Sequence, residues 1–130
     1  MPGLIKVALN IAKALDAIKD KERQLLDAQV DAAARIARNT IARDSEWAAD
    51  NIYAIHVGGA ARPAASDLRI NRRGRRSLRT AESVAAPPKG AAAFGCAASY
   101  AQAIELRDHT FSNAARAAWE EAQDTIAGTL

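Results

Sequence analysis

In the first 41 residues an apolar side chain recurs every three or four positions, which is the spacing of one face of an α-helix. The first stretch of this pattern consists of Leu4, Ala8, Ile11, Leu15 and Ile18. After a charged segment at 19–23, the second stretch consists of Leu26, Val30, Ala33, Ala37 and Ile41. The pattern predicts helix over residues 1–43. Because no glycine or proline stands at the charged segment, it leaves open whether one helix or two form.

A chain that begins with so much helix must bury the apolar face of that helix, yet its apolar residues are mostly small. Alanine accounts for 33 of the 130 residues, and all larger apolar residues together for 31. At 130 residues the chain is expected to form a single domain over 1–130. Because alanine buries little surface, we expect its core to form where small-faced helices approach closely. Such a core is marginal, so two partners for Ile5, Leu9 and Ile11 stay open: a neighbouring copy and the chain's own sheet.

The middle of the chain has the pattern of short strands separated by loops. A β-branched and aromatic run from Ile52 to Val57 precedes two glycines and predicts a strand. Residues 60–74 contain a proline, a glycine and scattered polar side chains, and they predict a long loop with at most a brief strand at 68–70. Residues 77–84 and 91–98 flank a Pro-Pro-Lys-Gly turn and predict a β-hairpin.

The end of the chain returns to the helical period. Its apolar stripe consists of Phe111, Ala115, Ala118, Trp119, Ala122 and Ile126. Thr110 or Ser112 is expected as the N-cap, and Gly128 is expected to stop the helix. These patterns together predict an α+β fold with three parts: N-terminal helices over 1–43, a small antiparallel β-sheet with a long basic loop over 51–98, and a C-terminal helix over 110–127.

The net charge of +3 conceals an uneven distribution. Residues 51–90 carry eight basic and two acidic side chains, whereas residues 91–130 carry two basic and five acidic ones. Six arginines lie within eleven residues around Gly74, and they are Arg69, Arg72, Arg73, Arg75, Arg76 and Arg79. The planar guanidinium group forms paired hydrogen bonds to carboxylate or phosphate, so this arginine cluster is a candidate interaction site.

Three interpretations of the arginine cluster are open. In the first it is a solvated basic loop, since charge runs are often merely exposed. In the second it binds nucleic-acid phosphates, although no aromatic residue lies between Leu68 and Val84 to stack on a base. In the third it contacts the acidic end of a neighbouring copy at Glu120, Glu121 and Asp124. Segregated opposite charges on one chain suit head-to-tail assembly, which closes into a ring when the rotation allows.

No residue pattern points to catalysis. His56 and His109 have no further metal ligand at the usual spacing, and His56 is expected to be hydrogen-bonded and half-buried. The single cysteine, Cys96, excludes an internal disulfide, and a small core residue is favoured for it over a thiol nucleophile. We therefore expect no enzyme, cofactor or metal site. The longest uncharged run, 90–104, has 15 residues against the roughly 20 of a membrane span, so a cytosolic protein is expected.

Between Gly74 and Leu106 the sequence reads Gly-Arg-Arg-Ser-Leu-Arg-Thr-Ala-Glu-Ser-Val, a Pro/Gly turn, Ala-Phe-Gly, and Tyr-Ala-Gln-Ala-Ile-Glu-Leu. It resembles the tail-completion or neck proteins of long-tailed bacteriophages. Their usual pattern is a Gly-Arg-Leu-Arg strand opening, a hairpin, Tyr-Ala-x-x-(aliphatic)-Glu, and then Phe with an alanine-rich helix. The matching positions are Gly74, Tyr100, Ala101, Ile104, Glu105 and Phe111. Leu106 and Arg107 replace the Gly and Thr of the pattern, and residues 44–73 exceed the usual connection.

The resemblance implies a non-enzymatic structural subunit of the head-tail junction, which forms an oligomeric ring around the path of the DNA. The implied partners are further copies of the chain, adjoining connector or portal-side proteins and tail-tube proteins, with non-specific DNA contact and no membrane. Such a subunit is assembled in the host bacterial cytoplasm and located in the virion. The alternative function is a basic nucleic-acid-binding module that uses the arginine cluster on phosphates.

Overall fold

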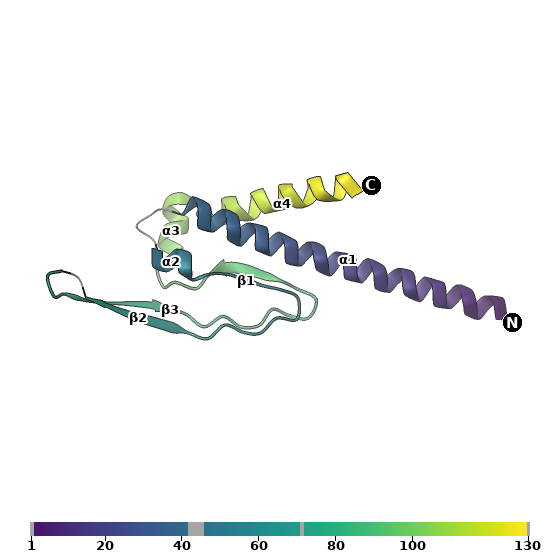
Figure 1. Cartoon of the computed structure of the whole chain (residues 1–130), viewed down its shortest axis with the longest axis horizontal. Helices are drawn as coiled ribbons and strands as arrows, with labels where there is room; N and C mark the ends of the chain where they lie inside the picture. Colours follow the sequence, from purple (N-terminus) through teal and green to yellow (C-terminus); the bar gives the residue numbers. More distant parts are fainter. Residues whose placement is uncertain (1, 42–45, 71, 130) are drawn as a thin grey trace.

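The computed structural model describes residues 2–41, 46–70 and 72–129, with side chains from Lys13 to Asp124 within them. Along the chain (Figure 1) the elements are α1 (Pro2–Thr40), α2 (Glu46–Asp50), β1 (Ile52–Ile55), β2 (Ala65–Ile70), β3 (Arg76–Ala81), β4 (Ala93–Cys96), α3 (Ala101–Asp108) and α4 (Thr110–Thr129). Helices at both ends and antiparallel strands between them confirm the predicted α+β fold. The expected packing of Ile5, Leu9 and Ile11 lies outside the described side chains.

Helix α1 is a single helix of 39 residues, so the charged segment 19–23 is an exposed turn and not a break. At 1.5 Å per residue a helix of this length is about 58 Å long. Its C-terminal half is packed, with Ala33, Ala34 and Ala37 no more than 3% exposed, whereas residues 13–20 are all exposed. In Figure 1, α1 lies between α4 on one side and the strands on the other.

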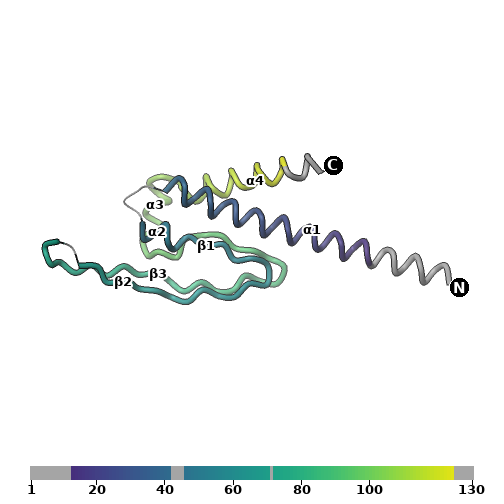
Figure 2. Tube along the Cα trace, viewed as in Figure 1, coloured from purple at the N-terminus to yellow at the C-terminus, as the bar shows by residue number. Residues whose placement is uncertain are grey.

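The strands form one long antiparallel ribbon that doubles back on itself. β1 pairs with β4, and β2 pairs with β3 as a hairpin. An isolated bridge joins Arg62 and Val84 between the two pairs, so all these pairings are nested in the sequence, one inside the next. Figure 2 shows the two chain segments leaving β1 and β4 side by side, turning, and returning as the β2–β3 hairpin.

The predicted hairpin of 77–84 with 91–98 is wrong. The first of these segments pairs with β2 and the second with β1, and the two meet only where the ribbon doubles back, at the Ala81–Ala98 bridge. A tight turn does form at 88–91, where the amide of Ala91 donates to the carbonyl oxygen of Pro88 at 3.0 Å, but it does not join two strands that pair with each other.

The predicted long loop at 60–74 is interrupted by strand β2 at 65–70, so the expected brief strand at 68–70 is present and begins three residues earlier. The tight turn between β2 and β3 includes Gly74, whose φ of 77° lies in the left-handed region that glycine adopts without steric cost. The arginine cluster therefore lies on a hairpin and its turn.

Two short helices, α2 and α3, were not among the predicted elements. Helix α3 ends at Asp108, and the next residue, His109, has a left-handed φ of 54° that reverses the chain before α4. Helix α4 begins at Thr110, as the periodicity predicts, but continues to Thr129, so Gly128 does not stop it. Within the described residues, no helix is both long and apolar enough to cross a bilayer.

The core consists of two adjoining clusters that are rich in alanine, as the composition predicts. In the first, Phe94 and Phe111 pack against Ala34, Ala37, Ile52 and Ala114. In the second, Trp47 and Tyr100 pack against Ala48, Ala98 and Ile104. The aromatic side chains thus fill the space that the alanines leave, which is the thin aromatic layer that such a composition requires.

Candidate interaction site

The β2–β3 hairpin, residues 65–81, projects from one end of the molecule (Figure 1) and is called the hairpin arm below. Side chains alternate along a strand, so its register sorts them onto two faces. One face is apolar at its centre and consists of Ser66, Leu68, Ile70, Arg76, Leu78 and Thr80. The other is charged and consists of Ala65, Asp67, Arg69, Ser77, Arg79 and Ala81. The arm is therefore amphipathic.

The structure brings all six arginines of the cluster together on the hairpin arm. Arg69 and Arg79 lie on the charged face, and the Nε of Arg69 donates to Oδ2 of Asp67 at 3.1 Å. The other four lie at the turn or beside it, and they are Arg72, Arg73, Arg75 and Arg76. Arg79 is half-buried and the rest are exposed. Positive charge is thus concentrated at the tip of the arm.

The hairpin arm is anchored to the rest of the chain at its base. There the carbonyl oxygen of Thr80 accepts hydrogen bonds from the indole Nε1 of Trp47 at 3.1 Å and from the amide of Ser99 at 2.9 Å. Farther out, the apolar face is uncovered, with Leu68, Ile70 and Leu78 exposed by 55%, 63% and 65%. Sequence reasoning missed this face, although the i, i+2 spacing of Leu68 and Ile70 is the signal that reveals it.

The three acidic residues that were predicted to contact the arginines of a neighbouring copy lie on α4, but their surroundings differ. Both carboxylate oxygens of Glu121 accept hydrogen bonds from the guanidinium of Arg35 on α1, at 3.0 and 2.9 Å, so Glu121 has a partner within its own chain. Glu120 and Asp124 are exposed. Helix α4 and the hairpin arm lie on opposite sides of α1 (Figure 1), so the arm and the carboxylates of one chain do not meet each other.

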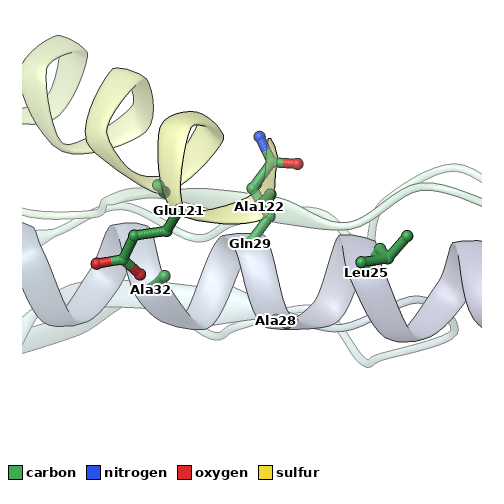
Figure 3. Close-up of a pocket in the computed structure, with 7 residues that line it drawn as sticks. Leu25, Ala28, Gln29, Ala32, Glu121 and Ala122 are labelled. Atoms are coloured by element: carbon green, nitrogen blue, oxygen red, sulfur yellow. The ribbon is translucent and has the colours of Figure 1, made fainter. Parts of the chain in front are cut away.

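A shallow apolar groove of about 80 Å³ runs between α1 and α4 beside Glu121 (Figure 3). Its lining consists of Leu25, Ala28, Gln29, Ala32, Ala118, Glu121 and Ala122. The small alanine side chains leave the hollow, and Glu121 lies at its edge. Leu25 also lines an adjoining hollow with Ala17 and Ile18, so the apolar surface continues along α1.

The residues from Tyr100 to Phe111 that match the neck-protein pattern hold the fold together. The Tyr100 hydroxyl accepts a hydrogen bond from the amide of Ala48 at 3.1 Å, and Ile104 is a buried core residue. Ala101 begins α3, and Phe111 stacks obliquely on Phe94 with ring centroids 6.5 Å apart. These positions therefore join α2, α3 and α4.

Glu105 is the cap of helix α4, a role that the sequence analysis gave to Thr110 or Ser112. Its carboxylate accepts hydrogen bonds from the amides of Phe111 and Ser112 and from the hydroxyl of Ser112. The hydrogen bond from the Ser112 hydroxyl is the main reason that the pKa of the Glu105 carboxyl is below its ordinary value. Burial is the next largest effect and opposes it, and the two amide hydrogen bonds lower the pKa further. A carboxylate at a helix N-terminus satisfies amides that have no partner within the helix.

Cys96 is a half-buried residue that packs against both core clusters, which agrees with the favoured prediction. Its thiol donates to the carbonyl oxygen of Ala48 at 3.2 Å. Burial raises the pKa of the Cys96 thiol, so the neutral form is favoured, whereas a reactive nucleophile requires the thiolate.

His56 is hydrogen-bonded, as predicted, but it is exposed instead of half-buried. It follows β1, and its Nε2 lies 2.8 Å from both carboxylate oxygens of Asp31 on α1. One helical turn earlier, Asp27 accepts a hydrogen bond from the amide of Val57 at 2.8 Å. The hydrogen bond with Asp31 raises the pKa of His56. These contacts fasten the end of β1 to α1, and among the described residues no three His, Cys, Asp or Glu side chains gather as metal ligands.

Searches of protein-family models, curated protein sequences and solved structures find no match to this chain.

Proposed function

We propose that this chain is a structural, non-enzymatic subunit of a bacteriophage head-tail junction, a neck or tail-completion protein. Copies assemble into a ring that surrounds the DNA path and joins the portal side of the head to the tail tube. The subunit assembles in the bacterial cytoplasm and ends in the virion. The resemblance of its motif to the tail-completion proteins supports the viral assignment, and the distribution of charge supports the ring.

The observation that carries the proposal is the placement of opposite charges on opposite sides of one chain. The arginine-rich hairpin arm projects from one end, and the exposed carboxylates Glu120 and Asp124 lie on α4, across α1 from the arm. Two different surfaces that complement each other give a head-to-tail contact, which repeats from copy to copy and closes into a ring when the rotation allows. The alanine-rich core is thin, so burial at such a contact adds stability to each copy.

A charge-reversal pair tests the ring. In the first variant, Arg72→Glu and Arg76→Glu reverse the tip of the arm; in the second, Glu120→Lys and Asp124→Lys reverse the surface of α4. We expect each variant alone to lose the oligomer of the native chain, because like charges then face each other. An equal mixture is expected to assemble again, since each reversed surface finds its complement on the other variant. Sedimentation velocity at low salt measures both outcomes.

A variant with Lys13→Glu and Lys19→Glu is the matched control for the arm variant, because it makes the same change in net charge on exposed residues of α1. It is expected to keep the native assembly. A native chain that stays monomeric over the whole accessible concentration range, alone and with connector or tail proteins, contradicts the proposal.

A second candidate function is non-specific nucleic-acid binding, and the shape of the hairpin arm favours it. A two-stranded antiparallel ribbon fits the major groove of B-DNA, and the exposed arginines at its tip suit phosphate contacts. If this function operates, Arg72→Ala with Arg76→Ala reduces the slope of log affinity against log salt concentration by about 2 on duplex DNA. An unchanged slope removes this candidate.

A further inference from the structure

Among the described residues, no other part of the chain covers the apolar face of the hairpin arm. Leu68 and Leu78 stand directly opposite each other in the register, and Ile70 extends the same face toward the tip. All three side chains are more than half exposed. An isolated two-stranded hairpin is marginally stable in water, and an apolar patch on a projecting arm is typical of a surface that binds a partner.

We propose that this apolar face docks into the groove between α1 and α4 of a second copy of the same chain. Leu68, Ile70 and Leu78 cover the groove, while the arginines at the tip reach the carboxylates of α4. This inference rests on the self-assembly proposed above and adds its apolar contact surfaces, which the charge argument alone does not specify.

The groove has the chemistry that such an arm requires. Its floor is made of alanines from both helices, which leave room for branched side chains, and Leu25 and Ile18 extend the apolar surface along α1. Ile18, which lines the adjoining hollow, is 61% exposed. Apolar surface on both partners is then removed from water by one contact, which is the main favourable contribution to association.

The charges around the two surfaces are complementary. Residues 65–81 of the arm carry six arginines and one aspartate, a net charge of +5. Residues 116–124 of α4 carry Arg116 and the three carboxylates Glu120, Glu121 and Asp124, a net charge of −2, and Glu121 is paired with Arg35 of its own chain. Opposite electrostatic potentials at the rim of an apolar contact fix the register of the two partners and speed their encounter. The arm and the groove therefore each fit a second copy of this chain as the partner.

The site of docking is tested by removing apolar contact without changing charge. Leu78→Ser is expected to weaken the association constant of the native chain about tenfold or more, because burial of a leucine is lost. Leu106→Ser is the matched control, since Leu106 is 73% exposed on α3, away from both surfaces. It is expected to leave association unchanged. Sedimentation velocity gives the constants, and circular dichroism verifies that both variants are folded.

Disulfide trapping provides a direct readout that does not depend on the stability of Leu78→Ser. One copy carries Leu78→Cys, and a second carries Ala28→Cys in the floor of the groove. A mixed dimer is expected under mild oxidation, and Ser77→Cys, one residue away on the opposite face of the arm, is expected to give much less. The native Cys96 is retained in all copies, because its thiol is half-buried and burial raises its pKa, which disfavours the reactive thiolate.

The outcomes separate this inference from the proposed function. Equal association of Leu78→Ser and Leu106→Ser, or equal trapping from positions 77 and 78, overturns the docking even if the charge-reversal mixture assembles as expected. In that case the ring proposal stands with a different apolar contact. A native chain that does not self-associate under any condition overturns both.

Discussion

Glu105 shows how one side chain decides where two helices meet. It lies near the end of α3, yet its carboxylate accepts hydrogen bonds from the first amides of α4. The left-handed His109 between the helices brings the two ends together. The motif resemblance marked this glutamate, and the structure gives it a physical task in orienting α4 against α1.

Replacing this cap is expected to destabilise the protein. Glu105→Ala leaves the amides of Phe111 and Ser112 without their acceptor, which lowers the free energy of unfolding by about 1 kcal/mol. Because the folded-state pKa of Glu105 is lowered, its contribution is present above the ordinary pKa of 4.5 and is lost as the pH falls through the folded-state value. Urea denaturation at pH 7 and at pH 3 measures both effects. Asp16→Ala, on the exposed part of α1, is expected to change neither.

His56 makes the attachment of β1 to α1 dependent on pH. Its folded-state pKa is raised above the ordinary 6.5, chiefly by the hydrogen bond with Asp31. The pair therefore contributes stability that is complete below pH 6.5 and is lost as the pH rises through the folded-state pKa. Thermal melts of native protein and Asp31→Asn between pH 5 and pH 9 are expected to diverge at the acidic end and to converge at the basic end. Parallel curves over this range contradict the role of the pair.

At the scale of elements, α1 is divided into a packed half and an exposed half. Ala37 is fully buried against β1 and α4, whereas Leu15 is 53% exposed. Ala37→Leu is expected to lower the free energy of unfolding by about 2 kcal/mol, because the close approach of the helices leaves no room for a larger side chain. Leu15→Ala is expected to change it by less than about 0.5 kcal/mol. Chemical denaturation of dilute protein measures both, and similar losses in the two variants contradict this division.

A helix or strand could be predicted from the sequence where the residues that determine it lie within the segment itself. Helices α1 and α4 were evident because their periodicity lies within the segment itself. Strand partners were not, because the alanine and glycine residues of β4 carry no pattern that selects β1 over β3. Helix α3 lacks a stripe of large apolar residues and depends on contacts with Ala48 and Phe111 for its place.

The sequence likewise predicted only part of the candidate site. The arginine cluster is visible in the sequence, because charge density is a local property. The pairing of Glu121 with Arg35 joins residues 86 positions apart, and no local signal indicates it. The groove between α1 and α4 likewise exists only once the two helices are packed.

At the scale of the whole molecule, the chain consists of a small alanine-rich body with a projecting hairpin arm and a long helix that extends past the core (Figure 1). Such a shape exposes much apolar surface for its length, including Leu15, Ile18, Leu68 and Leu78. A body of this kind is better suited to stacking beside copies of itself than to enclosing a small ligand, and this agrees with the proposed ring subunit.

The open strand edges of the hairpin arm favour aggregation, and its arginines oppose it. Toward the tip, β2 and β3 pair only with each other among the described residues, so each strand leaves one backbone edge open. An open edge is a template for adding further strands, and such addition leads to fibrils. Arginines along both strands repel another arm that approaches edge to edge. The arginines that attract an acidic neighbour in the proposed ring thus also oppose polymerisation of the protein through its strands.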